Sequence, residues 1–117
     1  MEEYEIEFYQ KNDGTCPIEE FFQDLPPKLW AKVARNIDIL KEFNINLREP
    51  LVKHVEDGIF ELRSQVNNDI ARVMYFFFID KKIILTNGFV KKTQKIPRKY
   101  IDTALEYRKD FLNRGEE

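Results

Sequence analysis

Two arginines are the residues in this chain whose type and spacing best suit chemistry. Arg63 and Arg72 lie in two apolar, strand-like segments that only Asn67-Asn68 separates. Asparagine tolerates the left-handed backbone conformation that a two-residue hairpin turn requires. With these asparagines as the turn, Arg63 faces Arg72 across the strands, and their Cβ atoms are about 5 Å apart. Like charges at this distance repel, so we expect a negative group to lie between them.

The negative group between the arginines has two candidates. One is an anionic ligand such as a phosphate, because a guanidinium binds two phosphate oxygens in a planar fork. The other is the carboxylate of Glu61, which shares a face with Arg63 because side chains alternate along a strand. Both stay open on the sequence, and a shift of one residue in the register would separate the arginines altogether.

A second group of cations follows Gly88. From Lys81 to Lys99 the chain has seven Lys or Arg and no Asp or Glu. We expect Gly88 to begin a connection between a strand and a helix that opens at Pro97. Polar side chains in such a connection can converge on a ligand, because the flanking elements hold them in place. The candidates are Lys91, Lys92, Thr93 and Lys95.

Two residues are candidates for accepting a proton at such a site. His54, the only histidine, can exchange a proton near neutral pH, but on a weak strand beside Lys53 it could equally be a packing or surface residue. A lysine held among other cations releases its proton more easily, which makes Lys91 the second candidate. The sequence does not choose between them.

The periodicity of apolar residues predicts the elements that must position these side chains. Strands are expected at residues 4–9, 51–55, 59–66, 69–79 and 83–87, and helices are expected to open at Pro17, after Pro26-Pro27 and at Pro97. The order is therefore β-α-α-β-β-β-β-α. It predicts an α+β fold over residues 1–117, with a mainly antiparallel, twisted sheet packed against two amino-terminal helices, and with a carboxy-terminal helix.

The two faces of the central hairpin should differ. One face is apolar and should pack against the helices, and it carries Phe60, Leu62, Val73, Tyr75 and Phe77. The face of Arg63 and Arg72 should then look outward into a groove. The connection after Gly88 leaves the next strand and could close one side of that groove.

Composition narrows the class of protein. The net charge is only -2, but residues 1–61 carry 14 acids and 7 bases, whereas residues 62–117 carry 7 acids and 12 bases. This asymmetry points to an anionic partner for the second half, or to surface charge that serves solubility. One cysteine, Cys16, excludes an internal disulfide and a multi-cysteine metal site. Without a signal-peptide pattern or a long apolar run, we expect a cytoplasmic protein with no membrane partner.

Three stretches carry a resemblance to a known family. They are Gly58–Arg63, Ala71–Phe77 and Gly88–Lys95, with Phe-Val-Lys-Lys-Thr-Gln-Lys the most specific run. In order and spacing they resemble the phage-derived HigB-like branch of the RelE/ParE toxin superfamily, over nearly the whole chain. The resemblance implies a RelE-like fold and a microbial toxin that pairs with an antitoxin, usually a helix-turn-helix protein. It also implies a toxin–antitoxin hetero-oligomer on operator DNA.

The resemblance also implies a function. The RelE and HigB members cut messenger RNA on the ribosome and need no metal or other cofactor. By this resemblance Arg72 and Arg63 match basic positions of the RNA-cutting members, and Lys91 or Lys92 matches the one beyond the last strand. We therefore expect Arg63, Arg72 and Lys91 to be catalytic. The expected RNA-binding residues are Lys92, Thr93, Lys95, Lys53 and His54.

Two other functions fit the same resemblance. The ParE members inhibit DNA gyrase without cutting RNA, so kinship of fold does not determine function. An inactive prophage remnant that binds only its antitoxin or DNA, as a regulator, is the third possibility. A pI near 5.6 departs from the strongly basic character of most RNA-cutting members.

Overall fold

The computed structural model describes residues 2–92 and 95–115, and its elements follow the predicted order. They are β1 (Glu5–Phe8), α1 (Pro17–Gln23), α2 (Pro27–Phe43), a 3-10 turn (Asn44–Asn46), β2 (Val52–Glu56), β3 (Ile59–Val66), β4 (Asp69–Phe78), β5 (Lys82–Lys91) and α3 (Arg98–Gly115). The α+β prediction is therefore confirmed. No helix among the described residues is long and apolar enough to cross a membrane.

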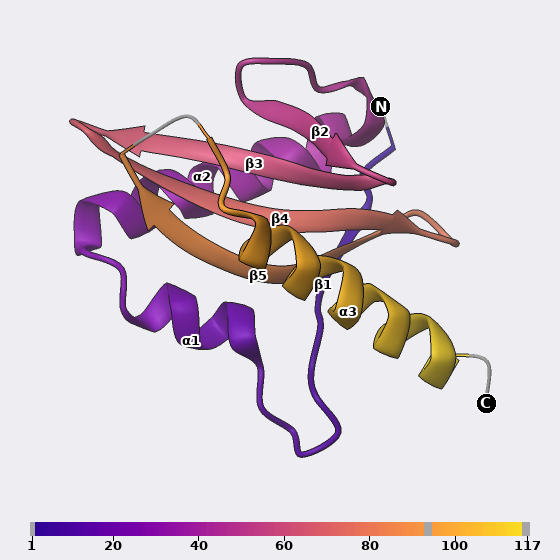
Figure 1. Ribbon diagram of the computed structural model, residues 1–117. Helices are drawn as coiled ribbons and strands as arrows, with labels where there is room; N and C mark the ends of the chain where they lie inside the picture. Colours follow the sequence, from indigo (N-terminus) through magenta and orange to yellow (C-terminus); the bar gives the residue numbers. More distant parts are fainter. Residues whose placement is uncertain (1, 93–94, 116–117) are drawn as a thin grey trace.

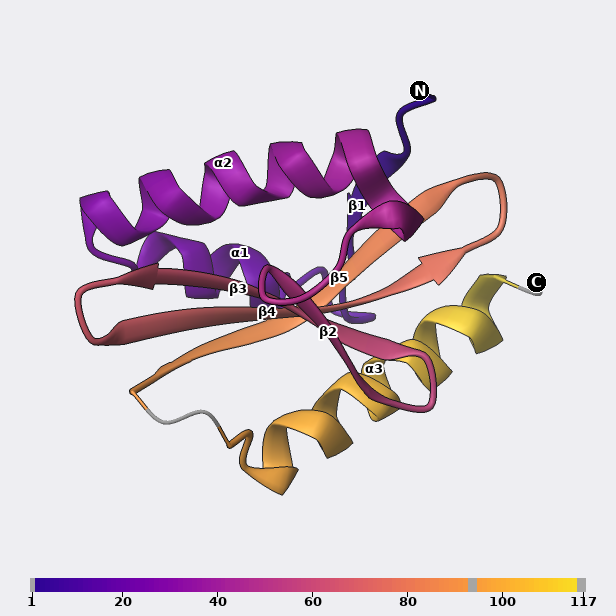
Figure 2. The same ribbon diagram turned by 90° about the horizontal axis from the view of Figure 1, so that it is seen from above.

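A single five-stranded sheet forms the centre of the fold. Its strand order is β1-β5-β4-β3-β2, and the only parallel pair in the described sheet is β1 with β5. Helices α1 and α2 lie on one face of the sheet, and α3 lies on the other face (Figures 1 and 2). Both faces of the central strands are therefore covered.

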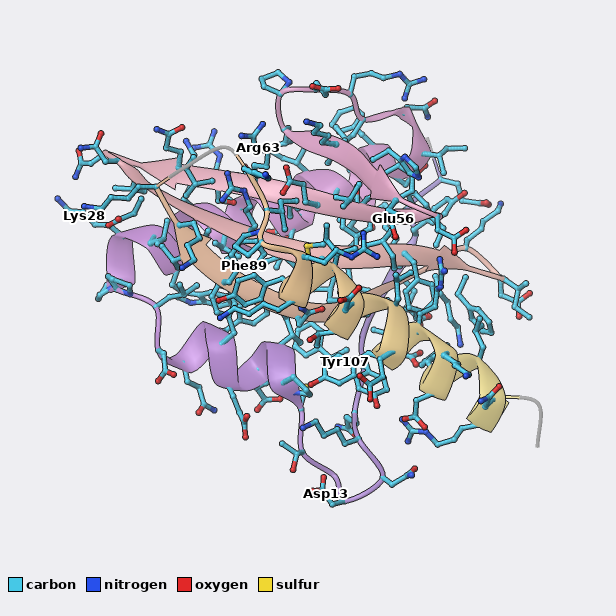
Figure 3. The ribbon with its side chains drawn as sticks, viewed as in Figure 1. Asp13, Lys28, Glu56, Arg63, Phe89 and Tyr107 are labelled. Atoms are coloured by element: carbon cyan, nitrogen blue, oxygen red, sulfur yellow. The ribbon has the colours of Figure 1, made fainter. Side chains whose placement is uncertain are left out.

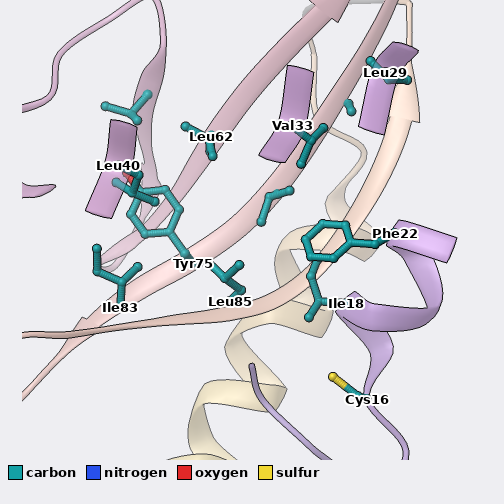
Figure 4. Close-up of a cluster of buried hydrophobic side chains, with 13 residues drawn as sticks. Cys16, Ile18, Phe22, Leu29, Val33, Leu40, Leu62, Tyr75, Ile83 and Leu85 are labelled. Carbon is teal, nitrogen blue, oxygen red and sulfur yellow. The ribbon is translucent and has the colours of Figure 1, made fainter. Parts of the chain in front are cut away.

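Two cores result from this arrangement. The larger one lies between the sheet and α1 and α2, and it contains Leu62, Val73 and Tyr75, with Phe60 and Phe77 at its margin (Figure 4). The second lies under α3, where its members include Ile59, Met74, Phe76 and Ala104. Strand β4 is buried on both sides, which explains why its sequence is apolar almost throughout rather than alternating.

The β3–β4 hairpin has the predicted register. Val66 pairs with Asp69 and Arg63 pairs with Arg72 across the two strands. Asn67 has φ 57, the left-handed conformation that the two-residue turn requires. The apolar face of the hairpin packs against α1 and α2 as expected.

Strand β5 is longer than the sequence indicated. It continues to Lys91, so the prediction that a connection begins at Gly88 is wrong. Between Leu85 and Gly88 the strand holds one residue more than β4 does opposite them, a bulge that reverses which side chains face each helix. Because the bulge interrupts the alternation of the strand, the pattern stops at Asn87 while the strand itself goes on.

Candidate functional site

The register gathers cations from four strands on the face that α3 covers. Arg63, Arg72 and Phe89 lie side by side in one row across β3, β4 and β5. Lys91 lies two residues beyond Phe89 on the same face, since side chains alternate along a strand. Lys53 of β2 pairs with Glu61, which lies on β3 two residues before Arg63 and on the same face. The strand register therefore places these cations on one face of the sheet.

Glu61 is the negative group between the two arginines. Its Oε1 lies 3.4 Å from Arg63 Nε, and its Oε2 lies 3.3 Å from Arg72 Nε. Glu61 is 1% exposed and Arg72 is fully buried. Of the two candidates left open by the sequence, the structure therefore has the carboxylate in this position.

Burial governs the protonation of this cluster. It raises the pKa of the Glu61 carboxyl above its ordinary value, and the opposing effects of Arg63, Arg72 and Lys53 are smaller. Burial likewise lowers the pKa of the Arg72 guanidinium. The loss of solvation therefore exceeds the mutual attraction of these charges, as is common for buried ion pairs.

Arg72 does not face a groove, and that prediction is wrong. Its guanidinium carbon lies 5.7 Å from the centre of the Phe89 ring, and Phe89 in turn stacks on Tyr100 of α3 at 3.9 Å between ring centres. Asn87 holds this part of α3 by donating a hydrogen bond to the carbonyl of Tyr100 at 3.2 Å. The two stacked rings thus cover Arg72, and α3 lies over this face of the sheet (Figure 1).

Arg63 is the arginine of the pair that reaches the surface. Its side chain is 19% exposed. It lines an open cleft of about 470 Å³ at the edge of the sheet, together with Lys32 and Asn36 of α2 and Gln65 of β3. The arrangement leaves a guanidinium with one side on a buried carboxylate and another toward solvent, where a phosphate could approach it.

Comparison with known proteins identifies the family. The model for the phage-derived protein Gp49-like family (DUF891) matches residues 20–109. The chain belongs to this family. No curated protein matches the sequence.

The fold of this Gp49-like chain is also similar to that of a chain in a solved structure. A chain in the crystal structure of the archaeal RelE–RelB complex from Pyrococcus horikoshii OT3 superposes with a TM-score of 0.54 and 20% sequence identity. The match covers 81% of this chain and 100% of that one. The predicted phage-derived family and the predicted RelE-like fold are thus confirmed.

The remaining predicted residues of the Gp49-like chain fall into three groups. Lys91, Lys92, Lys95 and Lys53 are exposed. Thr93 lies outside the described residues. His54 is exposed too, but it pairs with Phe60 on the opposite face of the sheet from Arg63.

His54 serves the β2–β3 turn. Its Nε2 accepts a hydrogen bond from the backbone N–H of Gly58 at 3.1 Å, and its ring meets Phe60 edge-on at 5.1 Å between ring centres. The structure therefore does not bring His54 together with the arginines. This geometry corresponds to the alternative reading of His54 as a packing residue.

Three contributors to the site were not predicted from the sequence. Phe89 and Tyr100 form the stack that covers Arg72. Neither was linked to the arginines, because simple alternation along β5 without the bulge places Phe89 on the opposite face of the sheet. Asn36 was also missed, although a polar residue on the apolar stripe of α2 is a recognisable signal. It is 4% exposed and donates a hydrogen bond to Ser64 Oγ at 2.9 Å.

Proposed function

We propose that this protein is the toxin of a toxin–antitoxin pair and that it cuts messenger RNA on the ribosome. The proposal is supported by the family, by the fold shared with the RelE–RelB complex and, above all, by one observation. Arg63 is a partly exposed arginine on a sheet face that also carries Lys53 and the exposed Lys91. A protein of acidic pI therefore has a local surface suited to a phosphate backbone.

The proposed reaction is an attack of a ribose 2′-hydroxyl on the adjacent phosphate. The new bond joins the 2′-oxygen to phosphorus, the bond from phosphorus to the 5′-oxygen breaks, and that leaving oxygen takes a proton from water. Negative charge grows on the phosphoryl oxygens, so a fixed cation that meets them lowers the barrier. We assign this contact to Arg63 and the proton transfer from the attacking hydroxyl to Lys91.

Arg72 takes a different part in this proposal. Because it is buried against Glu61, we assign it the positioning of that carboxylate, which in turn holds Arg63. Lys53, Lys92 and Lys95 are exposed and are assigned to the RNA backbone. The partner proposed for the toxin is an antitoxin, by analogy with RelB in the archaeal complex.

Expression in a bacterium, with mapping of RNA ends, tests the proposal. The wild type is expected to stop growth and to create new RNA ends inside coding regions. Arg63→Ala should abolish both, whereas Arg35→Ala, which removes an exposed arginine of α2, should behave like the wild type. Growth arrest with intact messenger RNA and a loss of DNA supercoiling would instead support gyrase inhibition. No growth arrest at all would support an inactive remnant.

A further inference from the structure

The outer edge of β3 is only partly covered by β2. The last pair between the two strands is Val52 with Leu62, and the N–H of Arg63 donates to the carbonyl of Leu51 at 2.9 Å. Beyond this point the described residues place no strand beside β3. The cleft that Arg63 lines opens there, between α2, the segment before β2 and the edge of β3. We call it the α2–β3 cleft.

One hydrogen-bond donor of the backbone, the N–H of Gln65, points into this cleft. The bond from Arg63 to Leu51 shows that the N–H of Arg63 is directed to the outer edge of β3. Alternation along a strand directs the N–H of Gln65 the same way, two residues further on. Gln65 is exposed and lines the cleft. A ligand there could therefore accept a hydrogen bond from the main chain.

Hydrogen bonds of Asn36 hold the wall of the cleft on the α2 side. Asn36 is buried in this wall and donates hydrogen bonds to Ser64 Oγ at 2.9 Å and to the carbonyl of Arg63 at 3.4 Å. These bonds tie the middle of α2 to the exposed end of β3. The two walls of the cleft that α2 and β3 form are therefore held to each other.

The charge of the lining residues selects an anionic ligand. Lys32 and Arg63 are the two cations, and the described lining includes no carboxylate. Ile39, Pro50 and Leu51 add an apolar surface beside them. A volume of about 470 Å³ falls within the range of small-ligand sites. Two cations next to an apolar wall fit a nucleotide, whose phosphate is charged and whose base is largely apolar on its faces.

We propose that the α2–β3 cleft binds the nucleotide of an RNA strand that neighbours the one at Arg63, with Lys32 contacting its phosphate. This inference rests on the proposed function and extends it, because it carries the RNA from the α3 side of the sheet around the edge of β3 to α2. Arg63 lies at the junction of the two surfaces.

Two lysines of α2 give a matched test. Lys28 and Lys32 are both exposed and lie one turn apart, but Lys32 lines the cleft and Lys28 does not. Lys28 lies near the start of α2, well apart from Arg63 (Figure 3). A fluorescent RNA hexanucleotide, followed by anisotropy, is the probe. Lys32→Glu should weaken binding by about tenfold or more and reduce the salt slope by about 1, whereas Lys28→Glu should match the wild type.

The outcomes separate the cleft from the nuclease activity. Equal binding by the Lys28 and Lys32 variants, or no binding of the hexanucleotide by the wild type, overturns the cleft even if the protein cuts messenger RNA in cells. Binding that depends on Lys32 in a protein that cuts no RNA would support the cleft and reject the proposed function. As a second readout, adenosine monophosphate should shift the backbone amide signal of Gln65 in the wild type and not in Lys32→Glu.

Discussion

At the scale of single residues, one buried carboxylate determines how the two arginines can act. Glu61 contacts both Arg63 and Arg72, which would otherwise face each other as like charges. Burial raises the pKa of the Glu61 carboxyl and lowers the pKa of the Arg72 guanidinium, so it favours the neutral form of each group. Because buried ion pairs in general add little to stability, we infer that this pair serves to keep Arg63 in place at the edge of the cleft.

Substitution of Glu61 tests this view of the pair. Glu61→Ala leaves two cations facing each other with no carboxylate, and we expect the free energy of unfolding to fall by about 3 to 5 kcal/mol in urea titrations. The double variant Glu61→Leu/Arg72→Met replaces the buried charges with apolar groups of similar size. It should regain most of the loss, and a double variant less stable than Glu61→Ala would contradict the argument.

At the scale of elements, the positions of α1 and α3 depend on close contacts with β5. Gly88 lies where α1 crosses the strand, and a Cβ added there would lie 2.5 Å from two ring carbons of Phe21. On the other face, the bulge of β5 directs Asn87 to α3, where it donates to the carbonyl of Tyr100. Strand β5 therefore determines the positions of both helices. Because Tyr100 belongs to α3, β5 also determines the position of the ring stack that covers Arg72.

Gly88→Ala measures the contact with α1. The added methyl must displace the Phe21 ring or the strand, and its other close neighbour, the carbonyl oxygen of Arg72 at 3.0 Å, cannot move away easily. We expect a loss of about 1 to 3 kcal/mol in the free energy of unfolding. Adding Phe21→Leu should restore part of it if the ring is the obstacle. An unchanged midpoint of unfolding for Gly88→Ala would show that α1 does not pack as described.

Substitution of Tyr9 tests how α3 is attached to the chain just after β1. Its hydroxyl donates to Asp110 Oδ2 at 2.6 Å, and burial, the first cause, raises its pKa to about 12. Because the folded pKa is raised, the stabilising effect is complete below about pH 10 and is lost as the pH rises toward 12. Tyr9→Phe should cost about 1 to 2 kcal/mol at pH 7 and remove this alkaline dependence. The measurement is urea unfolding at pH 7 and at a pH near 12. The control is Tyr107→Phe, which keeps the ring stacked on Tyr9.

The sequence predicted the elements well because most of them have local signals. The Asn67-Asn68 turn was enough to place Arg63 opposite Arg72, and the apolar stripe of α2 identified its buried face. The cover over Arg72 was not predictable, because it depends on where α3 docks after a bulge in β5. A bulge is one extra residue that moves the following side chains to the other face of the sheet. It can be located only when the pairing with the neighbouring strand is known.

At the scale of the whole molecule, acidic and basic side chains gather on different parts of the surface. The exposed residues Glu19, Glu20 and Asp24 belong to α1 and its end, whereas the exposed Lys91 and Lys92 are the last residue of β5 and the one after it. A net charge of -2 therefore says little about the surface that an RNA strand would meet. Long-range attraction to such a local patch falls steeply with salt.

The central claim, that Arg63 stabilises the transition state of RNA cleavage, is tested most directly in a purified translation system. Ribosomes translating a reporter messenger RNA are given the wild-type protein or Arg63→Ala, and the rate at which cut RNA appears is measured by primer extension. The wild type should cut within the translated region, and Arg63→Ala should be slower by about 100- to 1,000-fold. Cleavage by Arg63→Ala at the wild-type rate, with both proteins folded, would contradict the account.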